Sequence, residues 1–181
     1  MKLDLHRVVL IEDNHELRQL YEEMLRSDNN YSIAGSYSAC EEAIKKFAKD
    51  APDLIIIDLT LQGMTGIEGI IKFRKISTDV KILVLTVHDD DSHVFDALCA
   101  GANGYLLKTM DADALVAAIL RVMRGESVVA DEMTSKLVAA YRGATSGAGA
   151  PGFAAVEVPN VADSSPLAQL SPRELEILRA I

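Results

Sequence analysis

Aromatic residues are scarce in this chain, which has four phenylalanines, five tyrosines and no tryptophan among 181 residues. A hydrophobic core must therefore be built largely from leucine, isoleucine, valine and alanine. Apolar residues still make up 49% of the chain and charged residues 25%, a balance typical of a soluble globular protein and not of a disordered one. The length suits one ordinary domain with additional material, and two complete domains are not expected.

Cysteine is also rare, and long apolar runs are missing. Cys40 and Cys99 have no metal-site spacing and lie in apolar helical patterns, which predicts two small buried residues in a reducing compartment. No stretch approaches the roughly 20 apolar residues that span a bilayer. The N-terminus has no apolar run of signal-peptide length. The sequence therefore predicts a cytoplasmic protein without membrane contact.

Basic residues are too few to balance the acidic ones, with 18 lysines and arginines against 27 aspartates and glutamates. The net charge of -9 falls mainly on the first 142 residues. Such a surface repels the phosphate backbone, so a nucleic-acid-binding surface is not expected from bulk electrostatics.

Apolar runs rich in β-branched residues alternate with amphipathic stretches as far as residue 124. This alternation predicts a parallel sheet with helices on both faces. The expected strands are 7–11, 32–36, 54–58, 81–86 and 104–107. The expected helices are 15–27, 39–50, 67–76, 91–100 and 111–124. Two of these helix starts fit a capping box, Ser38-x-x-Glu41 and Thr65-x-x-Glu68.

The chain changes character after Gly125, where the first domain, residues 1–125, is expected to end. Residues 126–142 predict a short extended piece and an extra helix from 132. Residues 143–166 are rich in Gly, Ala, Ser and Pro, as in an interdomain linker. Residues 167–181 contain a third capping box and apolar residues on one helical face, which predicts the first helix of another unit.

Polar side chains gather where the predicted strands end. Glu12 and Asp13 follow the first strand, and Asp58, Thr86 and Lys108 close the third, fourth and fifth. Each has an ordinary structural explanation when taken alone, such as a solvated loop or a helix start. Because the carboxyl ends of parallel strands share one edge of the sheet, their joint occurrence predicts a single site there.

The chemistry of this predicted site follows from its residue types. Three carboxylates at one point repel each other unless a cation is present, and their hard oxygens suit Mg²⁺. Asp58 could then act as a nucleophile toward a phosphoryl group, with Lys108 and Thr86 contacting the phosphoryl oxygens.

Four sequence blocks carry a family resemblance: "LIEDN" at 10–14, "LIIIDLTLQGMTGIEGI" at 54–70, "ILVLTVHDD" at 82–90 and "AGANGYLLKT" at 100–109. In order and spacing they resemble the signature blocks of response-regulator receiver domains, over about the first 125 residues. The resemblance implies a flavodoxin-like fold, a doubly wound five-stranded parallel sheet in the order 2-1-3-4-5.

The resemblance also implies residue roles. Asp58 would be the phosphoacceptor, and Glu12, Asp13 and the backbone carbonyl of Thr60 would help it bind Mg²⁺. Lys108 would contact the phosphoryl group, Thr86 would be the switch hydroxyl, and Tyr105 the aromatic ring that turns inward when Thr86 moves. The implied partners are a sensor histidine kinase and, after phosphorylation, a second copy of the chain.

Two positions depart from the family pattern. Gln62 stands where proline is usual in the loop after the phosphoacceptor, which puts the shape of that loop in question. Thr109 follows Lys108 where proline or aspartate is common, and it leaves open whether the intervening peptide is cis.

The final segment, "LSPRELEILRAI", resembles the opening of a LuxR-type helix-turn-helix domain, and the order of segments is that of NarL/FixJ-type regulators. The DNA-recognition helix of such a domain would lie beyond Ile181. We therefore expect a regulator truncated at the start of its output domain, which does not bind DNA specifically through this chain.

Two other functions compete with this interpretation. One is a stand-alone receiver that acts by protein contacts, with the final helix docking elsewhere. The other is a phosphatase of the haloacid-dehalogenase type, which normally has a second aspartate two residues after the first. Thr60 occupies that position here, which argues against a phosphatase.

Overall fold

A computed structural model describes residues 5–87 and 91–129 of the chain. The extra helix predicted from residue 132, the linker 143–166 and the helix predicted in 167–181 all lie outside the described residues.

Six parallel strands form one sheet, in the order β2-β1-β3-β4-β5-β6. They are β1 (His6–Ile11), β2 (Tyr31–Tyr37), β3 (Leu54–Ile57), β4 (Lys81–Thr86), β5 (Gly104–Leu107) and β6 (Val128–Val129). The predicted order of the first five is confirmed, but the predicted count of five is wrong. The short extended piece after Gly125 joins the sheet as β6, because Val128 and Val129 pair with Gly104 and Tyr105 at the open edge of β5.

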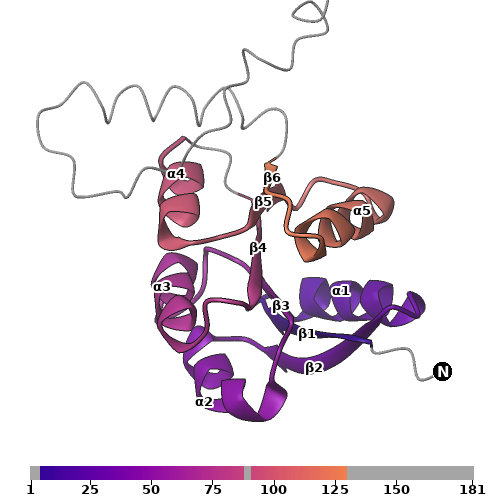
Figure 1. The fold of residues 1–181 in the computed structure, drawn as a ribbon, viewed down its shortest axis with the longest axis horizontal. Coiled ribbons are helices and arrows are strands. Elements are labelled where there is room, and N and C mark those ends of the chain that lie inside the picture. Colours follow the sequence, from indigo (N-terminus) through magenta and orange to yellow (C-terminus); the bar gives the residue numbers. More distant parts are fainter. Residues whose placement is uncertain (1–4, 88–90, 130–181) are drawn as a thin grey trace, which may run out of the picture. The chain divides into compact units, whose positions relative to one another are not determined.

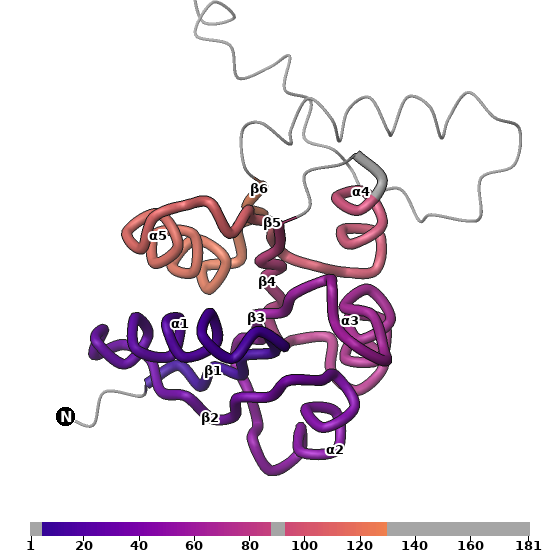
Figure 2. The backbone as a smooth tube through the Cα atoms, turned by 180° about the vertical axis from the view of Figure 1, so that it is seen from behind, coloured from indigo at the N-terminus to yellow at the C-terminus, as the bar shows by residue number. Residues whose placement is uncertain are grey.

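Five helices cover the two faces of this sheet. Helices α1 (His15–Ser27) and α5 (Ala112–Met123) lie on one side, and α2 (Cys40–Asp50), α3 (Gly66–Ile76) and α4 (Asp91–Ala100) lie on the other (Figure 1). The view from behind shows the same division (Figure 2). The predicted doubly wound architecture is therefore confirmed, and the element bounds differ from the expected ones by only a residue or two at most ends.

Each face of the sheet has its own hydrophobic core. On β3, Ile55 and Ile57 contribute to the core under α2, α3 and α4, whereas Leu54 and Ile56 contribute to the core under α1 and α5. Successive side chains of a strand point to opposite faces, so a strand covered on both sides must be apolar throughout. This explains the uninterrupted apolar runs in the sequence.

Of the two capping boxes predicted at helix starts in the described part of the chain, one is present in the structure and the other is not. Thr65 and Glu68 form the predicted capping box of α3. The box predicted at Ser38 and Glu41 is wrong, because α2 begins one residue later, after Ala39, whose side chain makes no capping hydrogen bond. The Glu41 carboxylate is used elsewhere and accepts a hydrogen bond from the Met64 backbone N–H at 2.9 Å.

The two cysteines differ in environment. Cys40 is buried as predicted, but Cys99 is exposed, so that expectation was wrong. Helix α4 turns Val94 and Ala97 toward the core. Cys99 follows Ala97 by two positions and therefore lies on the opposite side of the helix. Among the described residues, no helix has the length and apolar character required to cross a membrane.

Candidate functional site

The predicted site residues meet at the carboxyl edge of the sheet, as the strand ends require. Ile11 of β1 pairs with Ile57 of β3, so the residues that follow them, Glu12 and Asp58, leave the sheet side by side. The Asp58 N–H donates to the carbonyl of Ile11 at 3.0 Å. On the other flank, the Lys108 N–H donates to the carbonyl of Thr86 at 2.8 Å.

Lys108 joins two of the carboxylates in a buried ion cluster. Its Nζ lies 2.6 Å from Glu12 Oε2 and 2.8 Å from Asp58 Oδ2. The side chains of Lys108, Glu12 and Asp58 expose only 7%, 3% and 4% of their surface. The single ammonium group thus holds both acids in fixed positions with little competition from water.

Burial and charge act in opposite directions on these groups. Burial raises the pKa of Glu12, and its interactions with Lys108 do not fully offset that effect. Burial by itself would lower the pKa of Lys108, but its hydrogen bonds to Asp58 and Glu12 outweigh burial and hold the pKa above its usual value. Lys108 therefore stays protonated at neutral pH and serves as a fixed positive charge.

The same edge presents an oxygen-rich cluster that suits a hard cation. One carboxylate oxygen from each of Glu12, Asp13 and Asp58 can be chosen so that all three lie within 4.8 Å of one another. Asp58 Oδ1 is buried and has no hydrogen-bond partner among the described residues. A buried carboxylate oxygen without a donor is unfavourable. Three carboxylates against one lysine therefore leave a place for a divalent ion such as Mg²⁺.

Two further residues hold the loop that carries Glu12 and Asp13. Arg18, the fourth residue of α1, donates from Nη1 to the backbone carbonyl of Glu12. The Asn14 N–H donates to Glu12 Oε1 at 3.2 Å, while the Asn14 side chain caps α1. Arg18 was not among the site residues predicted from the sequence. The available signal was its position one helical turn after the cap Asn14, which directs its long side chain back over the loop.

Thr86 and Tyr105 are both fully buried, on neighbouring strands. Tyr105 pairs with Val84, and both belong to the core under α2, α3 and α4. Because side chains alternate along a strand, Thr86 is directed to the same face as Val84. The Tyr105 side chain is therefore part of the core on the face toward which Thr86 is directed.

The loop 59–65 leads from Asp58 to α3. The Gly66 N–H donates to the carbonyl of Leu59 at 3.0 Å, and a Cβ at Gly66 would lie 2.2 Å from the carbonyl oxygen of Asp58. Helix α3 thus begins directly against the backbone of Asp58, and glycine is required there. Thr60, whose carbonyl was predicted as a metal ligand, is exposed two residues after Asp58.

The two positions that depart from the family pattern lie close to this edge. Gln62 is exposed in the loop 59–65. The described residues contain no cis peptide bond, so the peptide between Lys108 and Thr109 is trans.

A family profile described as the response regulator receiver domain matches residues 8–120, more than half of the chain. The chain is 34% identical over 136 residues to the transcriptional regulatory protein DegU of Brevibacillus brevis, which covers 75% of this chain and 58% of that protein. It thus spans less than two thirds of this relative's length.

Two further similarities agree with that match. The chain is 30% identical over 174 residues to the nitrate/nitrite response regulator protein NarL of Escherichia coli K12, covering 96% of this chain and 74% of that protein. A crystal structure of a LuxR-family two-component response regulator from Aurantimonas superposes with a TM-score of 0.71 at 26% identity. That superposition covers 77% of this chain and 99% of the other.

Proposed function

Because the chain belongs to the response regulator receiver domain family, we propose that Asp58 accepts a phosphoryl group from a sensor histidine kinase. Receiver domains are signalling switches and not conventional enzymes, and this chain is homologous to LuxR-family two-component regulators.

One observation carries the proposal: the buried bridge from Lys108 to Asp58 and Glu12. Lys108 holds the Asp58 carboxylate at the sheet edge and keeps a positive charge beside it. A phosphoryl group attached to Asp58 brings oxygens that carry negative charge, and the ammonium group of Lys108 is close enough to contact one of them. The same lysine thus positions the nucleophile and stabilises the product.

The acidic cluster fits Mg²⁺, given its oxygen-only donors and the unpartnered Asp58 Oδ1. Glu12, Asp13 and Asp58 would hold the ion, together with the backbone carbonyl of Thr60. When bound, the ion supplies positive charge that offsets the repulsion between these carboxylates and the phosphoryl oxygens.

Transfer itself requires little of the protein beyond position and charge. A carboxylate oxygen of Asp58 forms a bond to phosphorus, and the bond between phosphorus and the donor histidine nitrogen breaks. The histidine leaves with the bonding electron pair and takes a proton from solvent. Burial of Asp58 keeps competing nucleophiles away from the mixed anhydride that results.

The phosphoryl group adds a charge of roughly -1.5 to -2 near neutral pH. In our proposal the Thr86 hydroxyl donates to this group, and the core around Tyr105 and α4 adjusts. A partner that prefers the adjusted surface then shifts the population toward it. We propose that a second copy of the chain is such a partner, and that the output is transcription through a DNA-binding domain.

Phosphorylation with acetyl phosphate and Mg²⁺, followed by intact-protein mass spectrometry, tests the proposal. We expect wild type to gain the mass of one phosphoryl group, Asp58→Ala to gain none, and chelation of Mg²⁺ to prevent the gain. Asp79→Ala, which removes an exposed aspartate of the β4 entry loop, is the matched control and should behave as wild type.

A full mass gain in Asp58→Ala would show that the acceptor is another residue. The same variants, treated with beryllofluoride and measured by size-exclusion chromatography with light scattering, test dimerisation. A dimer is expected for wild type and Asp79→Ala only, and a monomer in every sample would contradict the proposed self-association.

A further inference from the structure

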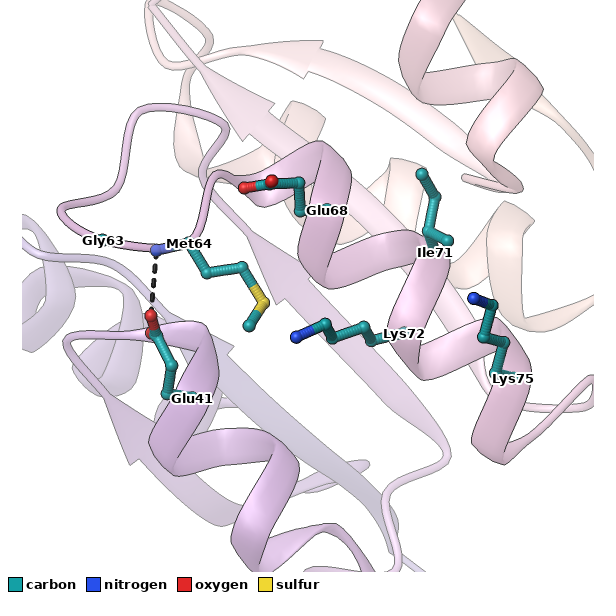
Figure 3. Close-up of a pocket in the computed structure, with 7 residues that line it drawn as sticks. All are labelled: Glu41, Gly63, Met64, Glu68, Ile71, Lys72 and Lys75. Atoms are coloured by element: carbon teal, nitrogen blue, oxygen red, sulfur yellow. Dashed lines mark hydrogen bonds between the residues drawn. The ribbon is translucent and has the colours of Figure 1, made fainter.

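We propose that Glu41 is a positioning residue for the phosphorylation site, acting through the loop 59–65 that follows Asp58. This inference rests on the proposed function, since it concerns the same site. Glu41 belongs to α2, and its carboxylate reaches across to the tip of that loop (Figure 3).

The contact is specific. Glu41 Oε1 accepts the hydrogen bond from the Met64 N–H at 2.9 Å. At the neighbouring Gly63, φ is +83°, and a Cβ added there would lie 2.8 Å from the same oxygen. Any other residue at position 63 would be strained by this positive φ and would push the Glu41 carboxylate away from its position beside the loop. The other oxygen, Glu41 Oε2, is buried without a hydrogen-bond partner among the described residues, so Met64 is the bonded donor at this carboxylate.

The loop has other anchors, and one of them is the Met64 side chain, which packs against the core under α2, α3 and α4. Leu59 and Leu61 are buried in the core, and the Gly66 N–H closes the base onto the Leu59 carbonyl. Thr65 and Glu68 form the capping box at the start of α3. Gln62 and Gly63, which with Met64 form the tip of the loop, are exposed. The hydrogen bond from the Met64 N–H to Glu41 restrains the backbone of this tip.

Packing does not hold the tip on its outer side. A groove of about 380 Å³ opens there, lined by Glu41, Gly63 and Met64 and by four α3 residues, Glu68, Ile71, Lys72 and Lys75. Figure 3 shows the bond between Glu41 and Met64 at one wall of this groove, with Lys72 extending from α3 on the other side. Without the bond, the backbone at Gly63 and Met64 would be held on this side only by the packing of the Met64 side chain.

Position 62 explains why an external restraint is needed. A proline at this position would fix its φ angle and reduce the number of conformations that the loop can adopt. Gln62 does not restrict φ in this way. The hydrogen bond from α2 supplies rigidity from outside the loop. Thr60 is joined to the tip through Leu61, so displacement of the tip acts on the Thr60 carbonyl through that one buried residue.

The test compares Glu41→Ala with Glu41→Gln, which keeps a carbonyl acceptor at the same place. The matched control is Glu42→Ala, which removes an exposed acid from the next position of α2. Two quantities are measured: hydrogen exchange of the Met64 amide without Mg²⁺, and Mg²⁺ affinity by calorimetry. Loss of a residue that orients metal ligands typically weakens metal binding by 10–100-fold.

We expect faster Met64 exchange and about tenfold weaker Mg²⁺ binding in Glu41→Ala. Glu41→Gln should lie between Glu41→Ala and wild type, and adding Gln62→Pro to Glu41→Ala should recover part of the affinity. If Glu41→Ala is too unstable to study, Glu41→Gln with and without Gln62→Pro supplies the same comparison.

Equal exchange and equal Mg²⁺ affinity in Glu41→Ala and Glu42→Ala would overturn the positioning role. That outcome leaves the proposed function standing if wild type is still phosphorylated on Asp58. Conversely, the proposed function fails if wild type gains no phosphoryl group, whatever the Met64 amide does.

Discussion

At the scale of single residues, Lys108 has the largest influence on the site, because it is the cation in contact with both buried acids, Glu12 and Asp58. The sequence indicated that these three residues share an edge, since each follows a strand. It did not indicate that Lys108 bridges two carboxylates, because the lysine side chain is long and flexible. Both acids also lie far from it in the sequence, and Asp58, the nearer one, is 50 positions away.

Replacing Lys108 with methionine should lower the free energy of unfolding by about 3–5 kcal/mol, because two buried carboxylates would lose their counter-charge. Lys45→Met, an exposed change on α2, should stay within about 0.5 kcal/mol of wild type. Urea unfolding at neutral pH without Mg²⁺ measures both. Equal stability of the two variants would mean that the bridge contributes nothing.

The loss should depend on pH in a defined direction. Burial raises the pKa of Glu12 above its ordinary value of 4.5, so the fold favours the neutral form. Protonation of Glu12 therefore contributes to the free energy of unfolding. This contribution is fully present below pH 4.5 and is lost as the pH rises through the pKa of Glu12 in the folded protein. The defect of Lys108→Met should therefore be largest at neutral pH and shrink on acidification. Saturating Mg²⁺ should also reduce it.

At the scale of elements, Arg74 ties α3 to its neighbours at the edge opposite the acidic site. It donates to the carbonyls of Gly101 at 2.9 Å and Val80 at 2.6 Å, and to Asn103 Oδ1 at 2.7 Å. Asn103 Oδ1 also accepts from the Ile82 N–H at 2.9 Å. One guanidinium thus connects the end of α3, the start of β4 and the turn between α4 and β5.

Arg74→Ala should lower the free energy of unfolding by about 2–3 kcal/mol, because several partly buried acceptors lose a charged donor. Arg74→Lys should recover little, since an ammonium group cannot reproduce the forked geometry of the guanidinium. The control is Lys75→Ala, the next residue, whose side chain is exposed. Denaturant unfolding measures the free energy of unfolding of all three variants. A loss in Lys75→Ala as large as in Arg74→Ala would refute the structural role of the Arg74 hydrogen bonds.

Helix starts show when a local sequence pattern is enough to predict a capping interaction. The box at Thr65 and Glu68 forms as predicted, since both partners lie within one turn and the helix begins beside them. The pattern at Ser38 and Glu41 is equally good in sequence, yet Glu41 bonds to Met64. A carboxylate that could take part in a local capping box bonds instead to a backbone N–H distant in the sequence when packing brings that donor within hydrogen-bond distance.

At the scale of the whole molecule, the sheet extends beyond the predicted boundary at residue 125. Val128 is buried in the core under α1 and α5, and its N–H donates to the Asn103 carbonyl at 3.1 Å. The sequence predicted a short extended piece here, but β6 is only two residues long, and a periodic pattern that short cannot show that the piece joins the sheet. It closes the edge of β5 and completes one of the two cores.

Val128→Ala should therefore lower the free energy of unfolding by about 2 kcal/mol, from lost apolar burial and a residual cavity. Val87→Ala removes the same atoms from an exposed valine and should have almost no effect. Thermal and urea unfolding provide the comparison. Identical stabilities would show that β6 does not belong to the folded unit in solution.

Sequence alone determined the layered fold, the order of the first five strands, and the shared edge of Glu12, Asp13, Asp58, Thr86 and Lys108. The layered fold and the shared edge follow from periodicity and chain direction, which each segment carries within itself, whereas the strand order was implied by the family resemblance. Tertiary structure alone decided the bridge made by Lys108, the pairing of β6 with β5, and the contact between Glu41 and Met64. Those depend on which donors and acceptors packing brings within hydrogen-bond distance, and no local pattern specifies that.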